Sequence, residues 1–208
     1  MTFSDWARPS PPASNSKPHE VFTLVEERSF VVLDVDVTGV HPRKDHATGI
    51  ATLPLKGGRF RLADIRYCPL AASGQWNENP DPAWRPHYRA IVDTAASSLI
   101  VTYNIRFVRH MIKRTADLQG LPLPYGRWID LGAVLNGAIG KEMGQATSLH
   151  LWQKRLLVDD IARYSAVADV FAMAQLLAIA ITVAEERGIP TLDGVLAEHR
   201  SRIWPHRE

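Results

Sequence analysis

The nine residues 29–37 (SFVVLDVDV) constrain the fold more than any other part of this chain. They are mostly β-branched or apolar, which predicts a strand buried on both faces. Asp34 and Asp36 lie two positions apart and therefore project to one face, with Cα atoms about 7 Å apart. Burying two like charges is costly unless cations or hydrogen-bond donors compensate. A divalent cation is the usual compensation, and a solvated edge strand is the alternative that this segment alone leaves open.

The segments that follow predict an antiparallel meander. Residues 50–55 and 59–67 are strand candidates on either side of the KGG turn at 56–58, and Gly-Gly is a strong hairpin signal. Pro54 weakens the first of these strands or places it at an edge. Residues 71–87 contain three prolines and are expected to form a long surface loop.

Alternating strands and helices are predicted for the rest of the chain. Further strands are expected at 98–103 and 128–131, and the second of these leads into a helix that runs through residue 135. Other helices are expected at 106–119, 148–157 and 165–187. Three antiparallel strands followed by such units predict an α/β fold, with a mixed five-stranded sheet and helices on both faces. Sites in sheets of this kind form where strands end and helices begin.

The 208 residues have room for one sizeable domain, expected at 21–190. A flexible arm rich in Pro and Ser is expected at 1–20, and a basic C-terminal extension at 191–208. Cys68 is the only cysteine, which excludes internal disulfides and favours a reducing, cytoplasmic location. No apolar run is long enough to predict a membrane span.

The net charge of +2 does not by itself demand a nucleic-acid partner. Basic side chains gather at 106–114 and again at 199–207. A solvated surface and a contact with an anionic ligand are both open for these clusters.

Three segments together resemble the motifs of the DEDD exonucleases, the family of polymerase proofreading subunits and ribonuclease T. DVDVTG at 34–39 is similar to the first motif, Asp-x-Glu-x-Thr-Gly after an apolar strand. YNIRFV at 103–108 aligns with the second, His-Asn-x-x-Phe-Asp, and YSAVAD at 164–169 with the third, a His and an Asp separated by four residues. Their order and spacing agree from about residue 28 to 187. The resemblance implies an RNase H-like exonuclease fold.

The resemblance also implies a catalytic site in which two metal ions cleave the 3′-terminal phosphodiester. Asp34, Asp36 and Asp169 match three of the family's acids and are the expected catalytic ligands of Mg²⁺ or Mn²⁺. Tyr164 stands where the family has the His that deprotonates water, and Val108 stands where the second-motif Asp belongs.

Substrate contacts are implied for four further positions. Thr38 and Gly39 follow the first strand and are expected near the terminal nucleotide. Asn104 and Phe107 belong to the second motif, and Asn104 is open between a turn-forming role and a substrate contact.

The departures from the family pattern all predict a damaged metal site. Asp36 is one methylene shorter than the usual Glu, and Mg²⁺ tolerates little distortion. Val108 cannot ligate a metal, and an unperturbed Tyr164, with a pKa near 10, is a poor base. Weak or single-ion binding is therefore expected. Asp130 is a candidate replacement for the lost acid, whereas the acids at 159–160 are expected to cap the last helix or complement its dipole.

Three functions follow from these expectations. The first is a 3′–5′ exonuclease with altered metal use. The second is a catalytically inactive module that binds a single-stranded nucleic-acid 3′ end or a nucleotide. The third is a module that docks on a polymerase-type protein through the N-terminal arm or the C-terminal tail. An exonuclease-like domain with weak or no hydrolysis, and no membrane association, is favoured.

Overall fold

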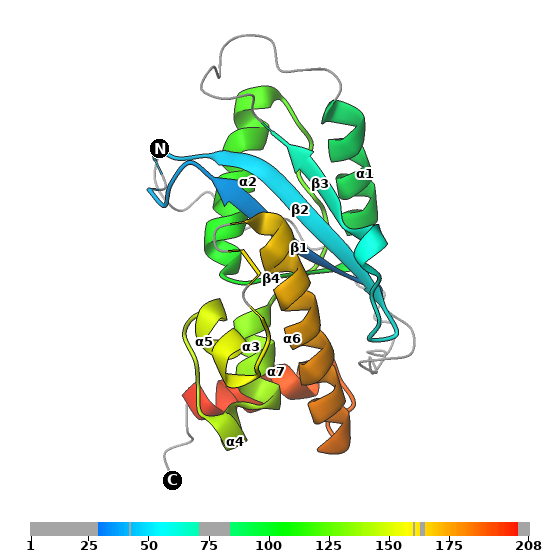
Figure 1. The fold of residues 1–208 in the computed structure, drawn as a ribbon, viewed down its shortest axis with the longest axis vertical. Helices are drawn as coiled ribbons and strands as arrows, with labels where there is room; N and C mark the ends of the chain where they lie inside the picture. The colour runs from blue at the N-terminus through cyan, green and yellow to red at the C-terminus, as the bar shows by residue number, and fades with distance from the viewer. Residues whose placement is uncertain (1–28, 42, 71–83, 160, 163–164, 204–208) are drawn as a thin grey trace, which may run out of the picture.

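The computed structural model describes residues 29–41, 43–70, 84–159, 161–162 and 165–203 (Figure 1). Its centre is a sheet with the strand order β3-β2-β1-β4-β5. The strands are β1 (Ser29–Val37), β2 (Ala47–Lys56), β3 (Arg66–Pro69), β4 (Leu99–Thr102) and β5 (Trp128–Asp130). The pairs β1–β2 and β2–β3 are antiparallel, whereas β1–β4 and β4–β5 are parallel. The predicted mixed sheet with an antiparallel meander is confirmed.

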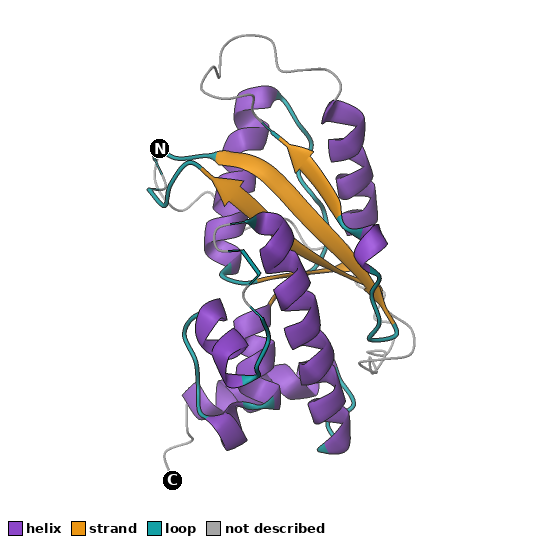
Figure 2. Cartoon of the chain, viewed as in Figure 1, coloured by secondary structure: helices purple, strands orange, loops and turns teal. Residues whose placement is uncertain are grey.

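Helices cover both faces of the sheet (Figure 2). They are α1 (Arg85–Ala96), α2 (Ile105–Gln119), α3 (Leu131–Ala138), α4 (Gly140–Met143), α5 (Leu149–Arg155), α6 (Ala166–Glu186) and α7 (Leu192–Ile203). Along β1, Val31, Leu33 and Val35 point to the core beneath α1 and α2. Phe30 and Val32 point to the opposite core, which α3 and α6 cover. Asp34 and Asp36 continue that second series and therefore lie on the α6 side.

The chain after the meander turn differs from the expectation. Gly57 and Gly58 both have positive φ, as a tight turn requires. Residues 59–67 do not continue as one strand, because a 3₁₀ turn at Leu62–Asp64 interrupts them. The guanidinium of Arg61 binds the Asp64 carboxylate across this turn. The strand β3 therefore begins only at residue 66 and pairs with residues 49–52 of β2, so that Pro54 lies on a stretch without β3 beside it.

Helices α1 and α7, like the short α4, lie where no helix is expected. The predicted loop at 71–87 lies partly outside the described residues, but its end starts α1, with Pro86 in the first turn. The residues expected to form a basic extension from 191 begin with α7, whose Val195 is buried against Gly137 of α3. The hydrophobic core of the described residues therefore includes α7.

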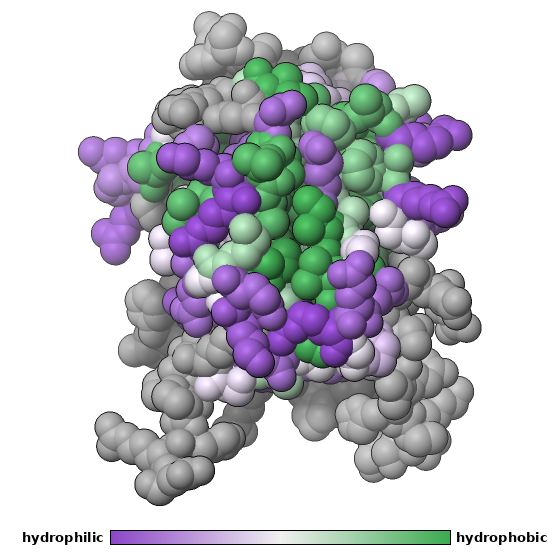
Figure 3. Space-filling view, turned by 60° about the horizontal axis from the view of Figure 1, so that its bottom comes forward, coloured by the Kyte–Doolittle hydropathy of each residue, from purple (hydrophilic) through white to green (hydrophobic). Residues whose placement is uncertain are grey.

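Helix α6 is long and apolar enough by composition to cross a membrane. Here it packs on β1, β2 and α3, and Val170, Met173 and Leu177 are buried in the core. Figure 3 brings the helical end of the molecule forward and shows apolar surface at the centre of that face, bordered by hydrophilic side chains. Because α6 packs on the sheet and on α3, it is a core helix of this domain. Its first turn carries Asp169 and lies beside the end of β1.

Candidate active site

Asp34 and Asp169 meet where β1 passes the first turn of α6. Their carboxyl groups share a hydrogen bond. Burial and the neighbouring negative charge of Asp169, with a smaller contribution from Asp36, raise the pKa of Asp34 to about 8. At neutral pH the pair therefore holds a proton. The fold brings together the first and the last predicted acid, as a site for a single cation requires.

Asp36 has a different environment although it lies on the same face. Its Oδ1 accepts a hydrogen bond of 2.7 Å from the backbone N–H of Ala166, the first residue of α6. The cap residue Ser165 makes no side-chain hydrogen bond to the helix, so Asp36 caps α6 from a distant strand. The Tyr67 hydroxyl donates a second hydrogen bond to Asp36. Both groups hold this carboxylate in place.

Tyr67 reaches Asp36 because the strand between them leaves room. Gly49 of β2 is the register partner of both Asp36 on β1 and Pro69 on β3. A Cβ atom at position 49 would collide with the Tyr67 hydroxyl. Burial, and then the hydrogen bond to Asp36, raise the pKa of Tyr67 to about 12, so its hydroxyl stays protonated and donates. Sequence reasoning missed Tyr67, since no local pattern marks its contact.

The remaining donors do not fit a pair of metal ions. Val108 is 2% exposed and belongs to the apolar core beneath α2, with Met111 and Ile112. The Asp130 carboxylate, the candidate replacement for the lost acid, accepts hydrogen bonds from the backbone N–H groups of Ala133 and Ile105 at 3.2 and 3.3 Å. Within the described ranges no group of three or more His, Cys, Asp or Glu side chains has a metal-binding arrangement. Among the predicted metal ligands in the described ranges, Asp34 and Asp169 are the two whose carboxyl groups interact directly.

The predicted substrate contacts Thr38 and Gly39 lie in a loop closed by Asp45. The Thr38 hydroxyl donates to the Asp45 carboxylate at 3.0 Å, and the His41 backbone N–H donates to it at 2.6 Å. These donors hold the pKa of Asp45 below its usual value, with the His41 N–H the larger cause. The Thr38 N–H itself binds the His46 carbonyl. The polar groups of Thr38 are therefore engaged within the loop.

The second-motif residues are engaged in starting α2. Asn104 has φ 59° and ψ 64°, and its side chain accepts a hydrogen bond from the Phe107 N–H at 3.4 Å. This is the turn-forming role that the sequence left open, with Asn as a residue that tolerates this conformation. Phe107 packs against the core beneath α2. Tyr164 and Asp160, the latter expected to cap α6 or complement its dipole, lie outside the described residues.

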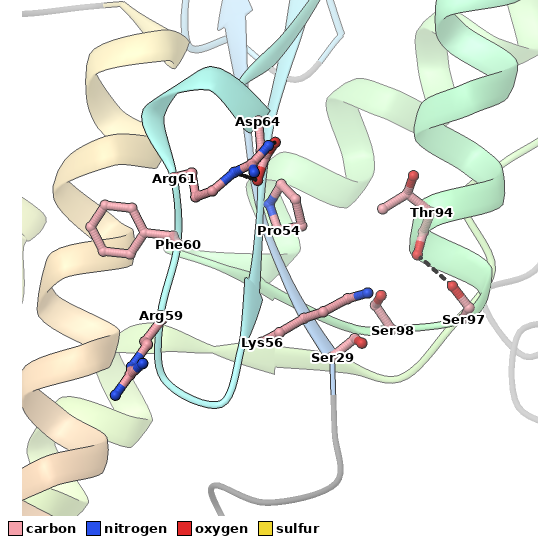
Figure 4. Close-up of a pocket in the computed structure, with 10 residues that line it drawn as sticks. All are labelled: Ser29, Pro54, Lys56, Arg59, Phe60, Arg61, Asp64, Thr94, Ser97 and Ser98. Atoms are coloured by element: carbon pink, nitrogen blue, oxygen red, sulfur yellow. Dashed lines mark hydrogen bonds and ion pairs between the residues drawn. The ribbon is translucent and has the colours of Figure 1, made fainter.

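Two hollows lie away from the acids. The first, called the α2 groove here, has a volume of about 530 Å³ and lies between α2 and residues 121–128. The second, the hairpin groove, has about 560 Å³ and lies at the other end of the sheet. In Figure 4 the Lys56 side chain extends across the hairpin groove toward Ser98, beside Ser29, whereas Arg61 is paired with Asp64.

No protein-family model and no curated protein sequence matches this chain. Solved structures do match. Escherichia coli exonuclease I in complex with a dT13 oligonucleotide has a TM-score of 0.60 at 14% identity, over 78% of this chain and 43% of the other. Cell-death related nuclease 4 (CRN-4) has a TM-score of 0.57 at 11% identity, over 74% of this chain and 64% of the other. A moderately thermophilic exonuclease I from Methylocaldum szegediense has a TM-score of 0.53 at 13% identity, over 77% and 41%.

The chain therefore has the RNase H-like fold of the DEDD 3′–5′ exonucleases, as the motif resemblance implies. It spans less than half the length of the exonuclease I chains that it matches.

Proposed function

We propose that this domain holds the 3′ end of a single-stranded nucleic acid, or a nucleotide, and has weak or no metal-dependent hydrolytic activity. One observation carries the proposal: Asp36 accepts hydrogen bonds from the Ala166 N–H and the Tyr67 hydroxyl. A carboxylate engaged in this way has little freedom to join an octahedral metal shell. The fold supports the class of ligand, since the matching E. coli exonuclease I structures include complexes with single-stranded DNA.

The electrostatics of the acid pair support the same proposal. With a pKa of about 8, Asp34 competes for a proton at neutral pH, and a cation at Asp34 and Asp169 has to displace that proton. Val108 adds no negative charge to hold a second ion. One weakly held Mg²⁺ or Mn²⁺ is therefore the most that we expect, in a soluble, cytoplasmic protein. Tyr164, at the position of the family's base, needs a strongly lowered pKa to act at neutral pH.

A trimming assay tests the proposal. Single-stranded DNA and RNA with a 5′ label are incubated with saturating Mg²⁺ or Mn²⁺ and the parent protein, Asp34→Asn or Val108→Asp. We expect an inert parent that nevertheless binds oligonucleotides with a free 3′-hydroxyl more tightly than circular single strands. Efficient trimming by the parent that Asp34→Asn abolishes would contradict the proposal. The same holds if binding shows no preference for the 3′ end and a mononucleotide does not bind.

A further inference from the structure

The α2 groove is built by one stripe of a helix and the edge of the sheet. Ile105, Arg109 and Ile112 recur at helical spacing on α2 and all line it. The opposite wall comes from Leu123 and Trp128, the latter being the first residue of the edge strand β5. Helix and strand both belong to the rigid frame of the domain, so the groove is preformed.

Its chemistry combines positive charge with a flat apolar wall. Arg106 and Arg109 are exposed, and His110 and Lys113 line the same hollow. None of the described residues that line it is Asp or Glu. The Arg109 guanidinium lies 5.6 Å from the centre of the Trp128 ring, in cation–π contact. A ligand that suits these walls carries negative charges and planar apolar groups together.

The groove begins at the same end of the sheet as the acids. Ile105 is the first residue of α2 and follows the carboxyl end of β4, which runs parallel to β1 beside it. Asp34 and Asp36 lie near the carboxyl end of β1, and neither lines the groove. A strand whose 3′ end lies at the acids has a basic, aromatic surface available along α2.

We propose that the α2 groove binds single-stranded nucleic acid along its length, with phosphates at Arg106 and Arg109 and a base stacked on the Arg109–Trp128 pair. Unpaired bases expose the faces that stack on such a pair, and every base has one. The proposal takes its class of ligand from the proposed function but needs neither a free 3′ end nor the acids. The two proposals therefore fail separately.

The test measures fluorescence anisotropy of a labelled oligothymidine and competition by circular single-stranded DNA over a salt series. The variants are Arg109→Ala, Arg109→Lys and Trp128→Leu. Lys56→Ala is the matched control, since it removes one exposed charge from the hairpin groove at the other end of the sheet. Asp34→Asn shows whether the acids of the candidate active site contribute to binding. Thermal unfolding of each variant checks that the fold is kept.

We expect the parent to bind the circular strand. Arg109→Ala should weaken that binding about tenfold and lower the slope of log K against log salt by about 0.7, the value for one phosphate contact to a single strand. Arg109→Lys should retain the salt slope but lose part of the affinity, and Trp128→Leu should lose affinity without changing the slope. Lys56→Ala should leave binding of the circular strand within about twofold of the parent, whereas Asp34→Asn tests how much the acids contribute to the preference for 3′ ends.

Three results would overturn the inference. The first is a parent that binds no circular strand. The second is a Lys56→Ala variant as weak as Arg109→Ala, which would make the attraction a property of the whole surface. The third is an Arg109→Ala variant that binds like the parent. If the parent binds linear and circular strands equally well while Arg109→Ala still weakens binding, the result would count against the proposed function alone.

Discussion

Asp34 and Asp36 are chemically identical and two residues apart, yet their removal should change stability in opposite directions. Asp36 accepts two hydrogen bonds in the folded protein, one of them from the N-terminus of α6. Asp34 is half-buried beside Asp169, and this environment disfavours its ionised form. We therefore expect Asp36→Ala to destabilise the domain and Asp34→Asn to stabilise it near and above neutral pH.

The loss in Asp36→Ala follows from the two hydrogen bonds. A helix cap contributes about 1 kcal/mol, and a further hydrogen bond to a partly buried carboxylate about 1 kcal/mol. The sum of about 2 kcal/mol corresponds to a decrease in Tm of about 4–8 °C for a domain of this size. Asp36→Asn keeps an oxygen acceptor for the Ala166 N–H, so it should lose less.

The gain in Asp34→Asn depends on pH. The pKa of Asp34 rises from 3.8 to about 8 on folding, so the folded state binds the proton more tightly than the unfolded state. The stability that this proton provides is complete below pH 3.8 and is lost as the pH rises to about 8. An amide has no such titration. The stability of Asp34→Asn relative to the parent should therefore grow over this window and then level off, at a few kcal/mol by order of magnitude.

The assay is thermal unfolding followed by circular dichroism, in buffers with a chelator, from acidic to mildly alkaline pH. The parent and the single variants are compared at each pH. If Asp36→Ala matches or exceeds the parent in Tm, then Asp36 is a repelled carboxylate like Asp34, and the assignment of a capping role is wrong. An Asp34→Asn curve parallel to that of the parent would refute the shared proton.

Four other changes test residues in and around the same site. Tyr67→Phe should lower the free energy of unfolding by about 1 kcal/mol, measured by urea denaturation, because Asp36 loses one donor, and Gly49→Ala should cost more because its methyl group meets the Tyr67 hydroxyl. Millimolar Mg²⁺ or Mn²⁺ should raise the Tm of the parent more above pH 8 than at pH 6, where the proton on Asp34 competes, and should leave the Tm of Asp34→Asn unchanged. Val108→Asp buries a carboxylate in an apolar core, so its midpoint in urea should fall by an amount equivalent to about 2–4 kcal/mol.

The sheet could be predicted because its signals are local. The apolar, β-branched run at residues 29–37 places β1, and the two glycines after Lys56 place the turn of the meander. The spacing of the three motifs gave the fold of the exonucleases, which the solved structures confirm. The prediction missed helix α1 because the three prolines in residues 71–87 indicate a loop. The apolar residues Tyr88, Ile91, Val92 and Ala95, all buried, carry the helical spacing that would have found it.

The state of the site could not be predicted in the same way. The motif gives Asp36 as an acid on the correct face, and that placement holds. Its hydrogen-bond donor on α6 is 130 positions away along the chain, and Tyr67 reaches it across another strand. Such contacts depend on how elements pack, and no periodicity or propensity encodes them. Tertiary packing therefore determines whether such a carboxylate is a metal ligand or a helix cap.

The cap and the acid pair are parts of one arrangement. Asp36 holds the first residue of α6, and Asp169 lies three positions further along the same helix, within one turn. By fixing the start of α6, Asp36 also fixes the distance between Asp169 and Asp34. Releasing Asp36 to serve as a metal ligand would therefore loosen the helix that carries another ligand. An aspartate at position 108 alone does not solve this conflict. Recovery of two-ion chemistry should require a new acid at 108 together with a separate cap for α6, for example a side chain at Ser165 that binds the helix N-terminus.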